Sequence, residues 1–211
     1  MVQWYNRTMK ILTFLSQKGG SGKTTLAVHC AVAAMQAGMR VEIADTDPQG
    51  SAMLWGLVRG NELPQVVRVQ ARGLDTLNHK GRNALLVVDS APHAAPEAAA
   101  LARASSLVVI PCRPSVFDLD SVASTVSIVR AANTPAVFVL SACPYGAPEI
   151  EQARVILAGH GLPIYPGQVT ERRVFSRATN SGHTVTETVF NRFSKAADEI
   201  RELWAWLRKE L

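Results

Sequence analysis

Residues 18–25 read KGGSGKTT and directly follow the apolar run 11–15. This order predicts a strand, then a glycine-rich loop, then the start of a helix. Successive backbone N–H groups of such a loop point at a bound phosphate, and the helix N-terminus adds a partial positive charge. The loop therefore constrains the chain to a fold that holds a phosphate group at the end of a strand.

The two lysines of the loop have different expected tasks. Lys23 can reach the β- and γ-phosphates of a nucleotide, and the Thr24 hydroxyl can ligate Mg²⁺. In the plain P-loop pattern a glycine stands five residues before Gly22, where this chain has Gln17. The loop instead carries an additional cation, Lys18, which simple phosphate binding does not need. The predicted cofactor-binding residues are Lys18, Gly19, Gly20, Ser21, Gly22, Lys23, Thr24 and Thr25.

The composition indicates one globular domain. The chain has 211 residues, 47% of them hydrophobic, and no apolar run that approaches the roughly 20 residues of a membrane-spanning helix. The N-terminus lacks the apolar core of a signal peptide, and the three cysteines lie far apart, which suits a reducing cytoplasm. We expect residues 9–211 to form a single domain and residues 1–8 to be an N-terminal extension without fixed structure. The net charge of +5 mildly favours polyanionic partners.

Apolar runs alternate with helical patterns along the whole chain. The runs 85–88 and 107–110 are continuously apolar, as expected for strands buried on both faces of a parallel sheet. This alternation predicts a doubly wound α/β fold, with a mostly parallel sheet and helices on both faces, that binds ligands at the carboxyl ends of its strands. The predicted strands are 10–16, 40–44, 65–69, 84–88, 106–110, 136–141 and 163–165. The predicted helices are 23–37, 49–59, 94–103, 119–132, 148–160, 172–180 and 191–211.

Acidic residues follow two of these strands. Asp89 closes the strand 84–88, which is where a P-loop fold places the acid that holds the Mg²⁺ shell. Asp45 and Asp47 stand at i and i+2 and therefore face the same way. If their strand neighbours the first one, Asp47 positions the attacking water and Asp45 supports the metal's water shell. The predicted metal site is Thr24, Asp45 and Asp89, and a helix cap or a solvated turn is the alternative for each acid taken alone.

Three segments together resemble the ParA/MinD family of deviant-Walker ATPases: the loop 18–25, the segment 45–50 (DTDPQG) and the segment 89–92 (DSAP). The resemblance covers nearly the whole chain from Met9. The length, the serine in the loop and the segment 110–115 (IPCRPS) are most similar to the short ParF-type plasmid partition ATPases. The stretch 170–185 is also similar to that group. One departure concerns the residues after Asp89, where the family often has two prolines and this chain keeps only Pro92.

The resemblance implies a mechanism. ATP drives a face-to-face homodimer in which Lys18 of each subunit reaches the nucleotide of the other. The implied catalytic residues are Lys18, Lys23 and Asp47, and the implied cofactors are ATP or ADP and Mg²⁺. The ATP-bound dimer binds nucleoid DNA without sequence preference, and a centromere-binding partner of the ParB type stimulates hydrolysis and releases it. The implied role is the segregation of plasmid or chromosome DNA by a cytoplasmic, nucleoid-associated protein.

A cluster of arginines is the candidate DNA-binding surface. Arg172, Arg173 and Arg177 lie within six residues, and Arg173 and Arg177 share a helix face at i and i+4. Two cations on one face repel each other unless an anion is present, so a phosphate ligand accounts for them. The alternative is a solvated or dimer-interface basic patch. Further cations can come from the last helix, at Lys195, Arg201, Arg208 and Lys209.

The sequence is also compatible with other functions. A MinD-like ATPase that positions a membrane or protein complex needs an amphipathic anchor, and the last helix has an apolar stripe from Phe193 to Leu211. The opposite face of that helix lacks a basic excess, so core packing is the better interpretation and a membrane partner is not expected. An iron–sulfur carrier needs interface cysteines, for which Cys112 and Cys143 are the candidates. An ATP-dependent synthetase of the same superfamily, or an ATPase that positions a protein complex, shares the motifs above.

Overall fold

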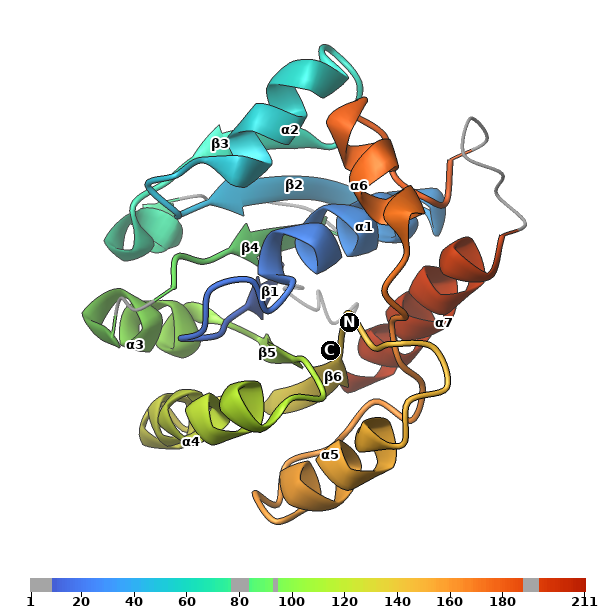
Figure 1. Cartoon of the computed structure of the whole chain (residues 1–211). Helices are drawn as coiled ribbons and strands as arrows, with labels where there is room; N and C mark the ends of the chain where they lie inside the picture. Colours follow the sequence, from blue (N-terminus) through green and yellow to red (C-terminus); the bar gives the residue numbers. More distant parts are fainter. Residues whose placement is uncertain (1–8, 77–83, 93–94, 188–193) are drawn as a thin grey trace, which may run out of the picture.

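The computed structural model describes residues 9–76, 84–92, 95–187 and 194–211. Residues 1–8, expected to be an extension, lie outside the described residues. A six-stranded sheet in the order β3-β2-β4-β1-β5-β6 forms the centre of the molecule, and every strand pairing in it is parallel (Figure 1). The strands are β1 (Lys10–Phe14), β2 (Arg40–Asp45), β3 (Gln65–Arg68), β4 (Ala84–Asp89), β5 (Leu107–Cys112) and β6 (Ala136–Leu140). The predicted doubly wound α/β fold is confirmed.

Helices cover both faces of the sheet (Figure 1). One face packs against α1 (Lys23–Gln36), α2 (Ser51–Arg59), α6 (Arg173–Asn180) and α7 (Lys195–Glu210). The other face packs against the 3₁₀ turn η1 (Ala71–Thr76), α3 (Ala95–Ala104), α4 (Val116–Ala131) and α5 (Glu149–Ala158).

A continuous apolar run serves both layers because successive strand residues face opposite ways. In β4, Leu85 and Val87 belong to the first core, whereas Leu86 and Val88 belong to the second. All six residues of this strand are buried.

The strand order brings the predicted site residues together. β1 lies between β4 and β5, and Phe14 at the end of β1 is in register with Asp89 at the end of β4. β2 does not neighbour β1, as the sequence prediction for Asp45 and Asp47 required; it pairs with β4, and Asp45 at its end is in register with Asp89. The loop after β1 and the acids after β2 and β4 therefore meet at one edge of the sheet, where doubly wound folds bind ligands.

Two expectations about elements need correction, and one element was not expected. Helix α4 begins at Val116 rather than 119, because Ser115 Oγ accepts the backbone N–H of Asp118 at 3.2 Å and caps the helix earlier. Residues 163–165 do not form a strand: Ile164 makes a single bridge to Phe138. The turn η1 had no sequence signal. No helix among the described ranges is long and apolar enough to cross a membrane.

Candidate functional site

The backbone conformation of the loop explains why glycine stands at two of its positions. Gly20 and Gly22 have φ angles of 73° and 96°, in the left-handed region that favours glycine. A Cβ atom on Gly22 would lie 3.3 Å from Ser141 Oγ, which itself donates a hydrogen bond to the Ser21 carbonyl at 2.6 Å. Gly22 is the N-cap of α1 and offers no side-chain cap. The first N–H groups of α1 are therefore left for an external acceptor, as at other anion-binding helix ends.

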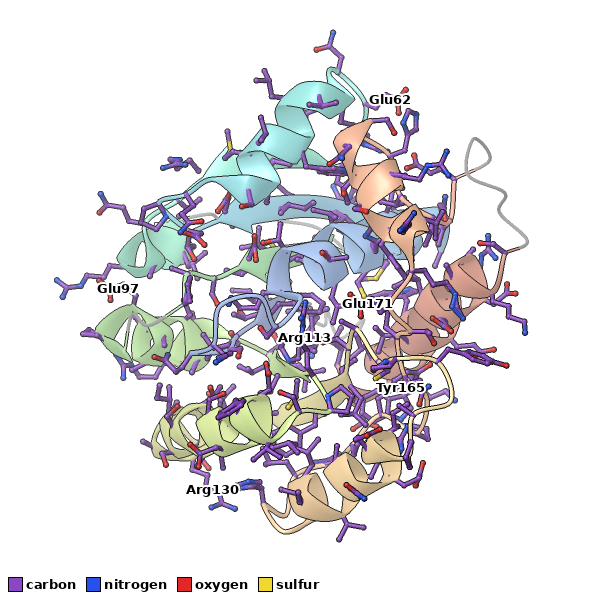
Figure 2. All side chains as sticks on the ribbon, viewed as in Figure 1. Glu62, Glu97, Arg113, Arg130, Tyr165 and Glu171 are labelled. Carbon is purple, nitrogen blue, oxygen red and sulfur yellow. The ribbon has the colours of Figure 1, made fainter. Side chains whose placement is uncertain are left out.

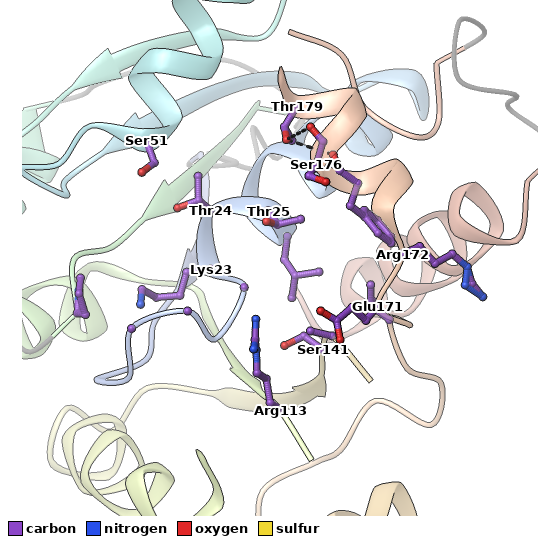
Figure 3. Close-up of a pocket in the computed structure, with 18 of the residues that line it drawn as sticks. Lys23, Thr24, Thr25, Ser51, Arg113, Ser141, Glu171, Arg172, Ser176 and Thr179 are labelled. Carbon is purple, nitrogen blue, oxygen red and sulfur yellow. Dashed lines mark hydrogen bonds between the residues drawn. The ribbon is translucent and has the colours of Figure 1, made fainter. Parts of the chain in front are cut away.

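A pocket of about 520 Å³ opens in front of this loop (Figure 3). Lys23 lies at one end of it, and Glu171 and Arg172 lie at the other. We define the first end of the pocket by the lining residues that come from the loop, α1 and the segments after β2 and β4: Gly19, Gly20, Gly22, Lys23, Thr24, Thr25, Leu26, Asp47, Gln49, Ser51 and Pro92. We define the second end by the lining residues that follow β5 and β6, which are Arg113, Ser141, Ala142 and a segment that we name the far wall, residues 169–172 with Phe175, Ser176 and Thr179.

The two loop lysines have different surroundings. Lys23 is buried, and its ammonium group donates a hydrogen bond to the Lys18 carbonyl at 3.0 Å. Burial lowers the pKa of Lys23, an effect that the nearby carboxylates of Asp89 and Asp47 oppose. Lys18 is half-buried and is not among the residues that line the pocket. The Lys18 side chain therefore does not contribute to the phosphate end of the pocket in its own subunit.

Asp89 is a buried carboxylate whose two oxygens have no hydrogen-bond partner among the described residues. Burial raises the pKa of Asp89 to about 7, and the nearby carboxylates of Asp45 and Asp47 raise it further. The Thr24 hydroxyl, which lies near Asp89 but outside hydrogen-bond geometry, and the Lys23 ammonium group lower it. Unpartnered buried carboxylate oxygens are rare because their desolvation is costly. A divalent cation with its water shell would give these oxygens a positive charge and hydrogen-bond donors. The oxygen ligands of Thr24 and Asp89 therefore fit Mg²⁺.

Asp45 and Asp47 occupy different positions. Asp47 lines the pocket and is half-buried, and one of its oxygens accepts the backbone N–H of Gln49 at 2.9 Å. Asp45 is fully buried behind it and is not part of the lining. Its oxygens accept the backbone N–H groups of Asp47 at 3.0 Å and of Met53 at 2.8 Å. Asp45 thus ties the loop after β2 to α2 and fixes the backbone at Asp47. Both of its oxygens accept backbone N–H groups, so its role in the metal's water shell stays a prediction.

Sequence reasoning missed much of the second end of the pocket. Arg113 follows β5 and Ser141 follows β6, and neither belongs to the loop motif. Arg113 and Glu171 reach the same pocket from segments far apart in the sequence (Figure 2). The similarity of residues 170–185 to partition ATPases was the one signal that pointed to the far wall, and it did not say which side chains face the ligand.

The three arginines of the candidate DNA surface are separated. Arg172 lines the pocket, and its guanidinium group pairs with the Glu199 carboxylate at 2.8 Å. Arg173 and Arg177 are exposed on α6. No ion pair with either of them occurs in the part of the chain that the structure describes. The exposed pair is therefore available to an external anion, whereas Arg172 is already engaged.

The glycine-rich loop, the acids at the ends of the neighbouring strands and the all-parallel sheet define a P-loop nucleotide-binding protein. The chain belongs to the CobQ/CobB/MinD/ParA nucleotide-binding domain family, whose family model matches residues 12–203. This is the family of the ParA/MinD-type ATPases, as the sequence resemblance indicated.

Named relatives support this assignment. The chain is 32% identical over 187 residues to the maintenance of carboxysome distribution protein A from Gloeobacter kilaueensis, and the aligned region covers 84% of each chain. It is 24% identical over 182 residues to a protein named ParA from Rhizobium radiobacter, which covers 80% of this chain and 81% of that protein. The MinD cell-division protein from Pyrococcus horikoshii, solved with Mg-ADP, has the same fold: the TM-score is 0.74 at 18% identity, over 95% of this chain and 96% of the other.

Proposed function

We propose that this protein hydrolyses Mg²⁺–ATP and uses the ATP cycle to segregate DNA. The observation that carries the ATPase part is the juxtaposition of three groups at the phosphate loop. Lys23 and Asp47 line the pocket, and Asp89 stands beside them with two unpartnered buried oxygens. The Mg-ADP in the related MinD structure agrees with this choice of ligand.

The residues present can divide the work of phosphoryl transfer to water. The N–H groups of the loop and the Lys23 ammonium hold the β- and γ-phosphates, and Thr24 and Asp89 hold the metal and its waters. Mg²⁺ neutralises the phosphate oxygens when it is bound. Asp47 orients the attacking water. Asp45 holds Asp47 in place, because the Asp47 backbone N–H donates a hydrogen bond to an Asp45 carboxylate oxygen at 3.0 Å. Positioning of this kind supplies most of the catalysis in this class of reaction.

Lys18 is proposed to act across a homodimer. Its side chain does not line its own pocket, although its carbonyl accepts the Lys23 ammonium inside the loop. The family resemblance gives this lysine the nucleotide of the second subunit as its target. Hydrolysis then depends on dimerisation, since a monomer lacks one of the two cations that face the phosphates.

The DNA part of the proposal depends on α6. Arg173 and Arg177 are exposed at i and i+4, on a helix whose residues Phe175, Ser176 and Thr179 line the pocket. Cations placed for phosphate contacts bind DNA without sequence preference and with a steep salt dependence. A dimer doubles the patch and raises affinity well above that of a monomer. A centromere-binding partner of the ParB type and association with the nucleoid belong to the same proposal.

Fluorescence anisotropy with a random DNA duplex tests the DNA part. The wild type should bind in Mg²⁺–ATP and weakly in Mg²⁺–ADP, and binding should fall steeply with salt. The double variant Arg173→Ala/Arg177→Ala should lose binding, whereas the matched control Arg103→Ala/Arg130→Ala, which removes two exposed arginines from the opposite face of the sheet, should not. Equal binding in ATP and ADP rejects nucleotide-gated DNA association. Normal binding by the first variant moves the DNA surface elsewhere.

A second candidate function is the positioning of a protein complex. The observation that favours it is the 32% identity to a protein whose name refers to carboxysome distribution. Both candidates share the ATPase cycle and differ in the cargo. Deletion of the gene discriminates them: loss of a plasmid or chromosome from dividing cells supports partition, and a stable genome with a misplaced protein complex supports the second candidate.

A further inference from the structure

The far wall of the pocket is held from outside by Glu199 on α7. Glu199 Oε1 accepts hydrogen bonds from the Thr170 hydroxyl and from the Arg172 guanidinium group, each at 2.8 Å. Glu199 Oε2 accepts the backbone N–H of Thr170 at 3.0 Å. Thr170 and Arg172 line the pocket, whereas Glu199 does not. A single carboxylate thus satisfies three donors of the far wall.

The far wall is also attached to the sheet side of the pocket by backbone hydrogen bonds. The Val169 N–H donates to the Leu140 carbonyl at 2.9 Å, and the Glu171 N–H donates to the Cys143 carbonyl at 2.8 Å. These bonds fix the backbone on either side of Thr170 but leave its own N–H and hydroxyl to Glu199. Thr170 is only 5% exposed, so its donors would lose their partner in a buried place if Glu199 were removed.

The position of the far wall indicates what it contacts. The phosphates of a nucleotide are fixed at the first end of the pocket, where the loop N–H groups and Lys23 lie. The rest of the pocket extends to the far wall (Figure 3). The nucleoside must therefore lie toward this end, between the loop and residues 169–179.

We infer that Glu199 is a positioning residue that sets the shape of the nucleoside end of the pocket through Thr170 and Arg172. The inference rests on the proposed nucleotide-binding function. It predicts that Glu199 matters for binding of the nucleoside and not of the phosphate chain, because the three hydrogen bonds that Glu199 accepts from described residues all come from the far wall.

Titration calorimetry in Mg²⁺ with two probes tests the inference. One probe is ADP, and the other is inorganic tripolyphosphate, which has the phosphate chain but no nucleoside. Glu199→Ala should bind ADP about tenfold more weakly, as expected when a charged hydrogen-bond acceptor is lost, and should bind tripolyphosphate like the wild type. Glu199→Gln keeps an acceptor for Thr170 but loses the charge opposite Arg172, so its affinity for ADP should be intermediate.

Glu202→Gln is the matched control, because Glu202 is an exposed glutamate on the same helix, and it should match the wild type with both probes. Wild-type affinity of both Glu199 variants for ADP overturns the inference. An equal loss for ADP and tripolyphosphate also overturns it, because Glu199 then supports the fold as a whole. Failure of the wild type to bind either probe instead overturns the proposed nucleotide-binding function.

Discussion

His29 makes the stability of this protein sensitive to acid. It is fully buried on α1, with Nδ1 2.8 Å from the Thr25 carbonyl and its ring 5.1 Å from the ring of Phe175 on the far wall. Its Nε2 atom has no hydrogen-bond partner among the described residues. Burial lowers the pKa of His29 from 6.5 to about 4, although the bond to Thr25 and the charge of Glu187 oppose this shift. The imidazole is therefore neutral at physiological pH and donates its Nδ1 proton to Thr25.

The sign of the pH effect follows from proton uptake. Below pH 6.5 the unfolded chain binds a proton at His29 that the folded protein does not bind until about pH 4. The free energy of unfolding therefore falls as the pH falls through this window, by about 1.4 kcal/mol per unit. Because the side chain is fully buried, solvent screening reduces this figure little. The slope is about half its full value at pH 6.5, where half of the unfolded chains carry the proton, so the loss between pH 6.5 and 5 is about 1.6 kcal/mol.

The perturbation that removes this dependence is His29→Leu, which replaces the imidazole with an apolar side chain of similar size. Urea unfolding of both proteins without nucleotide, at pH 7.5, 6.5, 5.5 and 5.0 and at constant ionic strength, measures the difference in unfolding free energy. Other titrating groups are common to both proteins and cancel. The variant should gain about 2 kcal/mol relative to the wild type between pH 7.5 and 5. The reasoning is refuted if the difference in unfolding free energy between the two proteins does not change with pH, or if the variant becomes less stable relative to the wild type in acid.

Three further predictions concern the phosphate end of the pocket. Lys18→Ala should bind Mg²⁺–ADP as a monomer but lose partner-stimulated ATP hydrolysis in a phosphate-release assay; turnover at the wild-type rate contradicts a role across the dimer. Asp47→Ala should bind ATP and dimerise in size-exclusion chromatography, yet hydrolyse ATP about 10²–10⁴-fold more slowly, which is the usual contribution of a group that positions a nucleophile. Unchanged turnover removes Asp47 from catalysis. Asp89→Ala should lose the Mg²⁺-dependent part of ADP binding, measured by calorimetry with Mg²⁺ and with EDTA; an equal loss in both buffers means that Asp89 only supports the loop.

The phosphate end of the pocket was predictable from the sequence because it is encoded locally. Gly20 and Gly22 permit the left-handed backbone that turns the loop around a phosphate, and no distant residue is needed for that preference. Asp89 follows a continuously apolar run, so its place at the end of a buried strand could be predicted too. The six strands of the sheet were found within two residues of their observed ends for the same reason. The start of α4 was missed because the Ser115 cap overrode the apolar pattern.

Only the tertiary structure decided which polar groups became partners. In sequence, Arg172 is one of three neighbouring arginines, but Glu199, 27 residues away on α7, engages it and turns it into part of the pocket wall. In sequence, Asp45 and Asp47 are equivalent acids on one face, but packing gives both oxygens of Asp45 to backbone N–H groups and leaves Asp47 at the pocket. Backbone conformation and apolar periodicity depend on residues close in the chain. The partner of a charged side chain depends instead on which donors and acceptors the folded chain brings within about 3 Å.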